Sequence, residues 1–154
     1  MRKIFWALGA LVLLGVFGVA YYGLSPLFVN IKVDEQAPSI PQTTPQQEES
    51  VPSATVMGTA GHPASGTARL VNADDKNYVR YENFKTINGP DIYVYLSKDL
   101  EAKEYVNLGR VRATEGNINY EIPPGIDPGE YRYVLIWCKA FSVLFNYADL
   151  STSR

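Results

Sequence analysis

The sequence has very few side chains suited to metal binding or covalent chemistry, because it contains one cysteine, Cys138, and one histidine, His62. A disulfide within the chain is therefore impossible, and covalent c-type haem, which needs two cysteines followed by a histidine, is excluded. Two ligands far apart in sequence do not predict a zinc site, which normally has three or four ligands. The chain also lacks an HExxH pattern, a glycine-rich phosphate loop and a nucleophile elbow, which favours an electron-transfer or binding module over a hydrolase or transferase.

Charge of one sign is not in excess either, since 14 basic and 16 acidic side chains give a net charge of −2. The two signs are interspersed, and no basic stripe of the kind that binds phosphates is present. A nucleic-acid partner is therefore not expected. No Asn-x-Ser/Thr sequon occurs, which excludes glycan attachment of that type.

The one long hydrophobic run is at the amino terminus, where Arg2 and Lys3 precede the uncharged residues 4–24. As a helix this run rises roughly 30 Å, which is the thickness of the hydrocarbon core of a bilayer. It predicts a transmembrane helix or signal anchor over residues 1–24, in a single-pass protein of the cell membrane with a cytoplasmic amino terminus and an extracytoplasmic remainder. The alternative is a cleaved signal peptide, because residues 18–20 form a small-x-small cleavage site.

Residues 25–57 form a segment rich in proline and glutamine that is almost free of aromatic side chains. Such a composition cannot bury enough apolar surface to offset the entropy lost on ordering. We predict a disordered linker from Asp34 to about Met57, which gives the following domain reach and carries no chemistry. Residues 58–154 are then long enough for one small domain with its own core.

Alternating hydrophobic residues with clusters of Gly, Pro, Asn and Asp between them predict strands throughout this domain. No amphipathic helix is evident between the strands. The pattern predicts an all-β fold, an antiparallel β-sandwich of about seven strands preceded by the helix and the linker. The predicted strands are 67–72, 78–85, 92–97, 106–113, 117–122, 131–138 and 141–149.

The alternation also bears on the thiol. In residues 131–138 one face carries Val134, Ile136 and Cys138, and this aliphatic face is expected to lie against the core. A cysteine buried there behaves as a small hydrophobic residue and is chemically inert. A lone extracytoplasmic cysteine has two other uses, as a reactive group or as one half of a disulfide to another chain.

The opposite face of the same strand is aromatic. If residues 92–97 and 131–138 lie in one sheet, their tyrosines form an aromatic outer face that could bind a partner or a second copy. The alternative is that tyrosine rings merely cover the sheet, since aromatic residues suit half-exposed strand positions. Together with the loop that precedes residue 92, the candidate binding surface comprises Gly89, Pro90, Asp91, Tyr93, Tyr95, Tyr131 and Tyr133.

Short motifs occur in sequence order at residues 66–68, 83–84, 88–97, 108–109, 119–123 and 136–145. Taken together, they resemble the electron-transfer DM-thirteen domain family. This module is found with DOMON and cytochrome-type domains in animal surface proteins, and alone behind a membrane anchor in microbes. The resemblance covers roughly residues 62–150.

The resemblance implies a β-rich extracytoplasmic domain and a redox role for the family's signature cysteine, which corresponds to Cys138. It also implies that His62 belongs to the domain and not to the linker. The accompanying cytochrome or DOMON segments are missing from this chain, so the resemblance names no electron donor or acceptor.

Two hypotheses follow. In the first, the protein is a membrane-tethered electron-transfer module in which Cys138 is catalytic. It either cycles as a free thiol or binds a cofactor such as haem or a metal, with His62 as the other soft ligand and Trp137 and Phe141 shaping the site. In the second, the domain is a binding or scaffolding sandwich at the cell surface and the cysteine only fills the core. The partner would be another redox protein or a surface protein.

Overall fold

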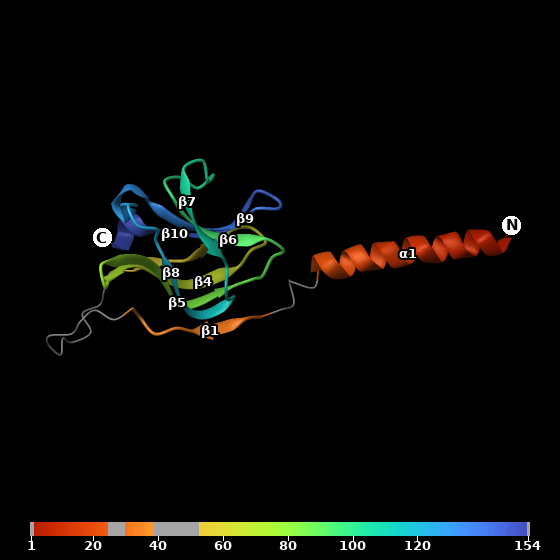
Figure 1. The fold of residues 1–154 in the computed structure, drawn as a ribbon, viewed down its shortest axis with the longest axis horizontal. Helices are drawn as coiled ribbons and strands as arrows, with labels where there is room; N and C mark the ends of the chain where they lie inside the picture. Colours follow the sequence, from red (N-terminus) through yellow and green to blue (C-terminus); the bar gives the residue numbers. More distant parts are fainter. Residues whose placement is uncertain (1, 25–29, 39–52, 154) are drawn as a thin grey trace.

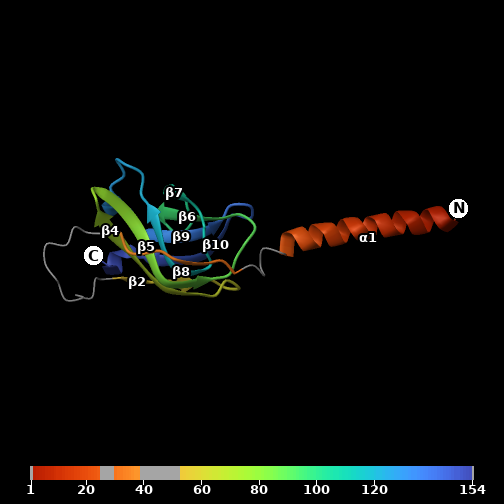
Figure 2. The same cartoon turned by 60° about the horizontal axis from the view of Figure 1, so that its bottom comes forward.

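The computed structural model describes residues 2–24, 30–38 and 53–153. Two five-stranded sheets pack face to face, and helix α1 stands apart from them (Figures 1 and 2). The elements are α1 (Arg2–Leu24), β1 (Lys32–Asp34), β2 (Ala54–Thr55), β3 (Met57–Gly58), β4 (Ala64–Ala73), β5 (Lys76–Thr86), β6 (Ile92–Ser97), β7 (Tyr105–Arg110), β8 (Glu115–Glu121), the 3-10 turn η2 (Pro128–Glu130), β9 (Tyr133–Cys138), β10 (Val143–Asp149) and the 3-10 turn η3 (Leu150–Ser153).

The first sheet has the strand order β1-β8-β5-β4-β2, and the second has the order β3-β10-β9-β6-β7. All neighbouring strands are antiparallel except β1 and β8, which are parallel. The seven predicted strands correspond to β4 through β10, so the prediction of a mostly antiparallel β-sandwich is confirmed. In Figure 1 the second sheet lies above the first.

The core fills the space between the sheets with aliphatic side chains at alternate strand positions. Val79 and Ile118 of the first sheet and Val94, Val134 and Ile136 of the second are all essentially inaccessible to solvent. Since successive strand residues point to opposite faces, these positions fix which side chains face outward. The core positions therefore determine whether each candidate site residue on β6 and β9 points into the core or to the outer face of the sheet.

The predicted linker differs from the structure at both of its ends. Residues 32–34 form β1, and residues 54–58 form β2 and β3, which pair with the edges of the two sheets. Strands of two or three residues are too short to show a period-two pattern, and sequence reasoning missed them for that reason. Residues 39–52, where disorder was also predicted, lie outside the described residues.

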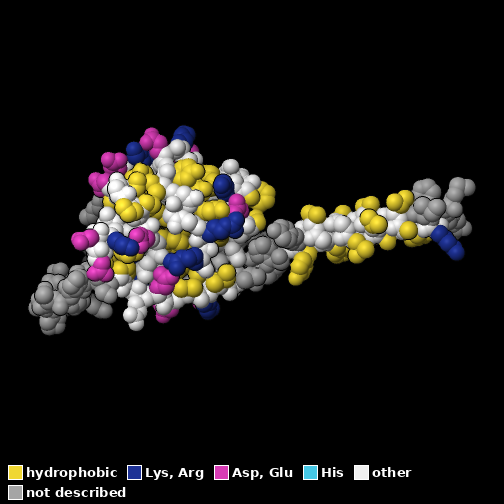
Figure 3. Space-filling view, in the orientation of Figure 1, with side chains coloured by type: hydrophobic (Ala, Val, Ile, Leu, Met, Phe, Trp, Pro, Cys, Tyr) yellow, Lys and Arg dark blue, Asp and Glu magenta, His cyan; other side chains and the backbone are white. Residues whose placement is uncertain are grey.

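The predicted amino-terminal helix is present as α1, with no acidic residue in its first turn and no proline within it. Figure 3 shows hydrophobic side chains along its surface, whereas charges of both signs are scattered over the visible face of the β domain. Of the helices in the described part of the chain, none combines the length and the hydropathy needed to cross a membrane. The prediction that residues 1–24 form a transmembrane helix is therefore not supported.

Candidate functional site

Cys138 is the last residue of β9, and its side chain is fully buried in the core, with 0 % of its surface exposed. Its partners across the sheet are Ile92 on β6 and Val143 on β10. The alternation had predicted a position inside the core or at its rim, and the structure places the residue inside. A dissolved reagent or a partner disulfide reaches this sulfur only if the sheet opens.

His62 lies in the turn between β3 and β4, and its ring is half-buried and stacks on Phe145 with 4.0 Å between ring centroids. Its Nδ1 is 3.2 Å from the Oγ1 of Thr59, which also lies 2.8 Å from the carbonyl oxygen of Leu144 and 2.9 Å from that of Phe145. The Thr59 hydroxyl has one proton, which goes either to one of these carbonyls or to an unprotonated Nδ1, so the tautomer of the imidazole sets the direction of this bond.

The structure does not join His62 to Cys138. No hydrogen bond or ring contact among the described residues links the imidazole to the sulfur. His62 stacks on Phe145 and Cys138 lies opposite Ile92. Phe145 and Ile92 both lie close to Gly89, where an added Cβ would be 2.9 Å from an atom of each. Across residues 2–24, 30–38 and 53–153 no group of three or more His, Cys, Asp or Glu side chains could hold a metal ion. The described residues therefore provide no metal centre built from three or more such ligands.

The two aromatic residues expected beside the sulfur are placed elsewhere. Trp137 precedes Cys138 on β9 and so points to the opposite face of the sheet, where it is half-buried. Phe141 is 70 % exposed in the turn between β9 and β10. Neither position encloses the thiol.

The outer face of the second sheet is strongly aromatic, because β6 and β9 are neighbours. Tyr93 lies opposite Trp137, and Tyr95 lies opposite Leu135. Leu135 is fully buried even though it points outward, since Tyr95 and Tyr147 flank it on the two adjacent strands. We call this surface the tyrosine face and define it by Tyr93, Tyr95, Tyr105, Tyr133, Trp137 and Tyr147.

The tyrosines of the tyrosine face form two groups of neighbouring rings. Tyr95 and Tyr105 stack with centroids 4.1 Å apart, and Tyr93 and Tyr95 are 6.2 Å apart. On the other side of β9, Tyr133 and Tyr147 meet edge to face at 6.2 Å. These separations are typical of favourable aromatic pairs. The rings of β6 and β7 therefore form a continuous line from exposed Tyr105 to half-buried Tyr93.

Burial, together with the neighbouring Tyr105, raises the pKa of Tyr95 to about 12. Its hydroxyl keeps its proton at neutral pH, so this buried ring brings no negative charge into the line. Tyr105 is 45 % exposed and stands at the solvent end of the stack. The line thus has one ring open to water and one enclosed ring behind it.

Two cations lie against Tyr93 of the tyrosine face, and Arg132 lies 5.0 Å from the ring centre of Tyr133. The guanidinium of Arg110 lies 5.3 Å from the ring centre of Tyr93, donates through Nε to the Tyr93 hydroxyl at 3.2 Å, and pairs with Asp91 at 2.6 Å. The Nζ of Lys139 lies 5.8 Å from the same ring centre. Such positive groups stabilise electron-rich rings and attract acidic surfaces. Asp91 is thereby held by an ion pair, and the exposed Pro90 stands beside it.

Tyr131 does not belong to the tyrosine face. It ends the 3-10 turn η2, before β9 begins, and packs against the core while Lys98 lies 5.8 Å from its ring centre. Sequence reasoning in turn missed Tyr105 and Tyr147, although both occupy predicted strands or their edges. The period-two pattern of β10 is interrupted by a bulge between Leu144 and Asn146, which hid the outward direction of Tyr147.

Comparison with known proteins adds one finding. A family model described as electron transfer DM13 matches residues 56–150, which include β3 through β10 and every residue of the tyrosine face. No curated protein and no solved structure matches the chain.

Proposed function

Because the chain belongs to the electron transfer DM13 family, we propose that its β domain moves single electrons along the tyrosine face, with Cys138 serving as a core residue. The observation that carries the proposal is the stack of Tyr105 on Tyr95 at 4.1 Å, extended to Tyr93 at 6.2 Å. Electron tunnelling weakens steeply with the gap between groups, so touching rings conduct far better than aliphatic side chains. Tyrosine and tryptophan are also side chains that lose one electron to form a radical, and the tyrosine face consists of them.

The location of the sulfur supports the same assignment. In thiol–disulfide exchange a thiolate attacks a sulfur atom of a disulfide, so the thiol must lose its proton and must come into contact with its partner. Cys138 has no exposed surface, and its cross-strand neighbours Ile92 and Val143 offer no base. The tyrosine face, by contrast, is reachable at Tyr105 and bordered by the cations Arg110 and Lys139.

In the proposed transfer each tyrosine that loses an electron also loses its phenolic proton. A one-electron oxidant docked at the face takes one electron from the phenol of Tyr105, and the phenolic proton leaves to water, which gives a neutral tyrosyl radical. Tyr105 then regains an electron and a proton together from the hydroxyl of Tyr95, with which it shares a hydrogen bond, so the neutral radical moves to Tyr95. Tyr93 next gives one electron to Tyr95 and releases its own phenolic proton to water, while Tyr95 takes a proton back from Tyr105 and Tyr105 takes one from water. A reductant then returns one electron to the Tyr93 radical, directly or through Trp137, and Tyr93 takes up a proton from water.

The second candidate function is docking without electron flow, and the same surface favours it. An aromatic face with a buried apolar centre is also suited to binding a partner protein. Here that centre is Leu135, which lies between Tyr95 and Tyr147 on the adjacent strands. The partner in either case is a redox protein or a surface protein with an acidic rim that matches Arg110 and Lys139. Only the first function depends on contact between the rings.

Flash oxidation separates the two candidates. A ruthenium polypyridyl photo-oxidant is attached at Lys103→Cys, an exposed position two residues before Tyr105, and the spread of the radical is followed optically. We expect transfer to Tyr93 or Trp137, and we expect Tyr95→Leu to abolish it because the central ring is removed. Tyr78→Leu, a half-buried tyrosine of the first sheet, is the matched control and should leave transfer unchanged. Equal transfer in Tyr95→Leu and in the control would refute the relay.

We also propose that the protein resides at the cell membrane, with the β domain on the outer side. Arg2 and Lys3 before the apolar residues of α1 support this location, as basic residues tend to stay on the cytoplasmic side. Fractionation of cells that express the full chain, followed by protease treatment of intact cells, tests it. A β domain that stays in the soluble cytoplasmic fraction, or that protease cannot reach from outside, would contradict the location.

A further inference from the structure

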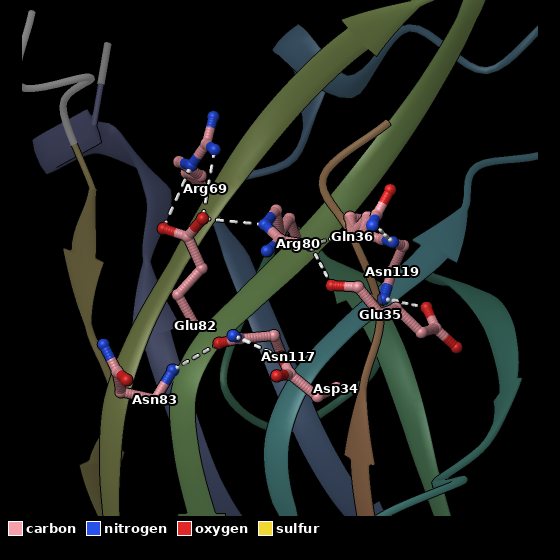
Figure 4. A network of polar contacts seen from close by, with 9 residues as sticks. All are labelled: Asp34, Glu35, Gln36, Arg69, Arg80, Glu82, Asn83, Asn117 and Asn119. Atoms are coloured by element: carbon pink, nitrogen blue, oxygen red, sulfur yellow. Dashed lines mark hydrogen bonds and ion pairs between the residues drawn. The ribbon is translucent and has the colours of Figure 1, made fainter. Parts of the chain in front are cut away.

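The amino-terminal segment 30–36 lies against the edge of β8, far in sequence from the strand it pairs with. The carbonyl oxygen of Ile31 accepts from the backbone N–H groups of Thr114 at 2.8 Å and Glu115 at 3.2 Å, and the N–H of Glu35 donates to Asn117 at 2.9 Å. Figure 4 shows the end of this segment beside the polar side chains of β5 and β8. The segment is thus an added edge strand with a short parallel ladder.

The side chains that hold this segment are mostly polar. Glu35 accepts from Arg112 at 2.7 Å and from the N–H of Asn119 at 2.8 Å, and Lys32 pairs with Glu115 at 2.7 Å. Asp34 accepts from Asn117 at 2.7 Å. Val33 alone adds packing against the core, since Ile31 is 42 % exposed. Exposed ion pairs contribute little and are screened by salt, so the segment is held weakly compared with the inner strands.

The first sheet keeps its own bonds when this segment is removed. Arg80 is 5 % exposed and retains Glu82 at 2.7 Å and Asn119 at 2.8 Å, losing only the carbonyl oxygen of Glu35 at 3.2 Å (Figure 4). Asn117 retains the N–H of Asn83 at 2.9 Å. The carboxylates and the lysine of the segment return to water. Release therefore keeps the partners that Arg80 and Asn117 have within the sheet, and it frees the backbone N–H groups of Thr114, Glu115 and Asn119, whose acceptors lie on the segment.

The acceptor edge is shaped for a close strand. Gly116 has a φ of 120°, and a Cβ added there would lie 1.8 Å from the carbonyl oxygen of Val33. The neighbouring backbone can approach β8 only because this position lacks a side chain. The backbone of the segment therefore fits against β8 at Gly116, and a side chain at position 116 would exclude the segment from this edge.

From these contacts we propose that residues 30–36 are a detachable latch that sets the length of the tether between α1 and the β domain. With the latch docked, only residues 25–29 separate the end of α1 from the docked segment, which allows a span of about 20 Å at most. With the latch released, residues 25–53 separate α1 from β2, which allows about 100 Å. The proposal rests on the edge of β8 and is independent of the electron-transfer assignment.

Hydrogen exchange on the full chain tests the latch. The amides of Thr114, Glu115 and Asn119 find their acceptors on the segment, so their exchange reports its release. We expect Glu35→Ala to speed all three, because it removes the bonds to Arg112 and Asn119. Glu121→Ala is the matched control. Glu121 also lies on β8, and its exposed ion pair with Lys76 of β5, at 3.0 Å, does not involve the segment. It should leave the three amides at the wild-type rate.

Two further measurements make the outcome decisive. Gly116→Ala should release the segment as well, and dyes on Ala20→Cys and Thr152→Cys should then report a longer mean distance than in the Glu121→Ala background. The amide of Val79, inside β5, should stay slow in every variant. Unchanged exchange at the three reporter amides in Glu35→Ala would overturn the latch. So would faster exchange of Val79 in step with them, because the segment would then be an integral strand of the fold.

Discussion

Replacing Cys138 by serine tests the position of the sulfur and its assigned role together. The side chain is fully buried between Ile92 and Val143, within a cluster of hydrocarbon side chains. A serine hydroxyl there is removed from water without a designed acceptor, which costs about 1–3 kcal/mol of unfolding free energy. Alanine leaves only a small void, so Cys138→Ala should cost about 1 kcal/mol.

The assay is urea denaturation followed by tryptophan fluorescence, combined with thiol titration of the native wild type. We expect the serine variant to be the less stable of the two, and both folded variants to carry electrons along the tyrosine face as the wild type does. The native thiol should react with a water-soluble reagent only as fast as the domain opens. Rapid labelling of the folded protein, or a serine variant as stable as the wild type, would refute the reasoning.

Three other predictions concern stability. Tyr81→Phe should stabilise the domain by about 1 kcal/mol, because the Tyr81 hydroxyl is buried and has no hydrogen-bond partner in the described residues; a loss of stability in urea denaturation would contradict this. Arg132 lowers the pKa of Asp149 to about 2, so this carboxylate stabilises the fold above the unfolded pKa of about 4 and loses the effect as pH falls toward 2. Between pH 2 and pH 5 the unfolding free energy should therefore change less with pH for Asp149→Asn than for the wild type. An equal change with pH in both proteins would contradict this. Arg80→Ala should cost about 1–3 kcal/mol, since it removes the buried bonds of Arg80 to Glu82 and Asn119 while Glu82 keeps its pair with Arg69 at 3.1 Å; a midpoint close to that of the wild type would count against that role.

The long strands were predictable because their side chains alternate over six or more residues. Ile118 and Tyr120, for example, are buried on β8 while their neighbours are more exposed. The same alternation placed Cys138 on the core side of β9. Strands β1, β2 and β3 carry no such pattern, because two or three residues that pair at a sheet edge are selected by backbone bonds and not by an apolar face.

The candidate site was predictable only in part. The alternation shows that Tyr93, Tyr95 and Trp137 point away from the core, but it does not show which strands are neighbours. Tyr105 joins Tyr95 through the pairing of β6 with β7, a contact set by the sheet order. The separation of His62 from Cys138 likewise depends on how the turn before β4 folds onto Phe145.

The most direct test of the relay is the identity of the radical formed when the full chain is photo-oxidised by one electron and frozen. Electron paramagnetic resonance should show a tyrosyl or tryptophanyl signal of equal intensity in the wild type and in Cys138→Ala. Loss of the signal in Cys138→Ala, or a sulfur-centred radical in the wild type, would mean that the thiol carries the electron and that the tyrosine face does not.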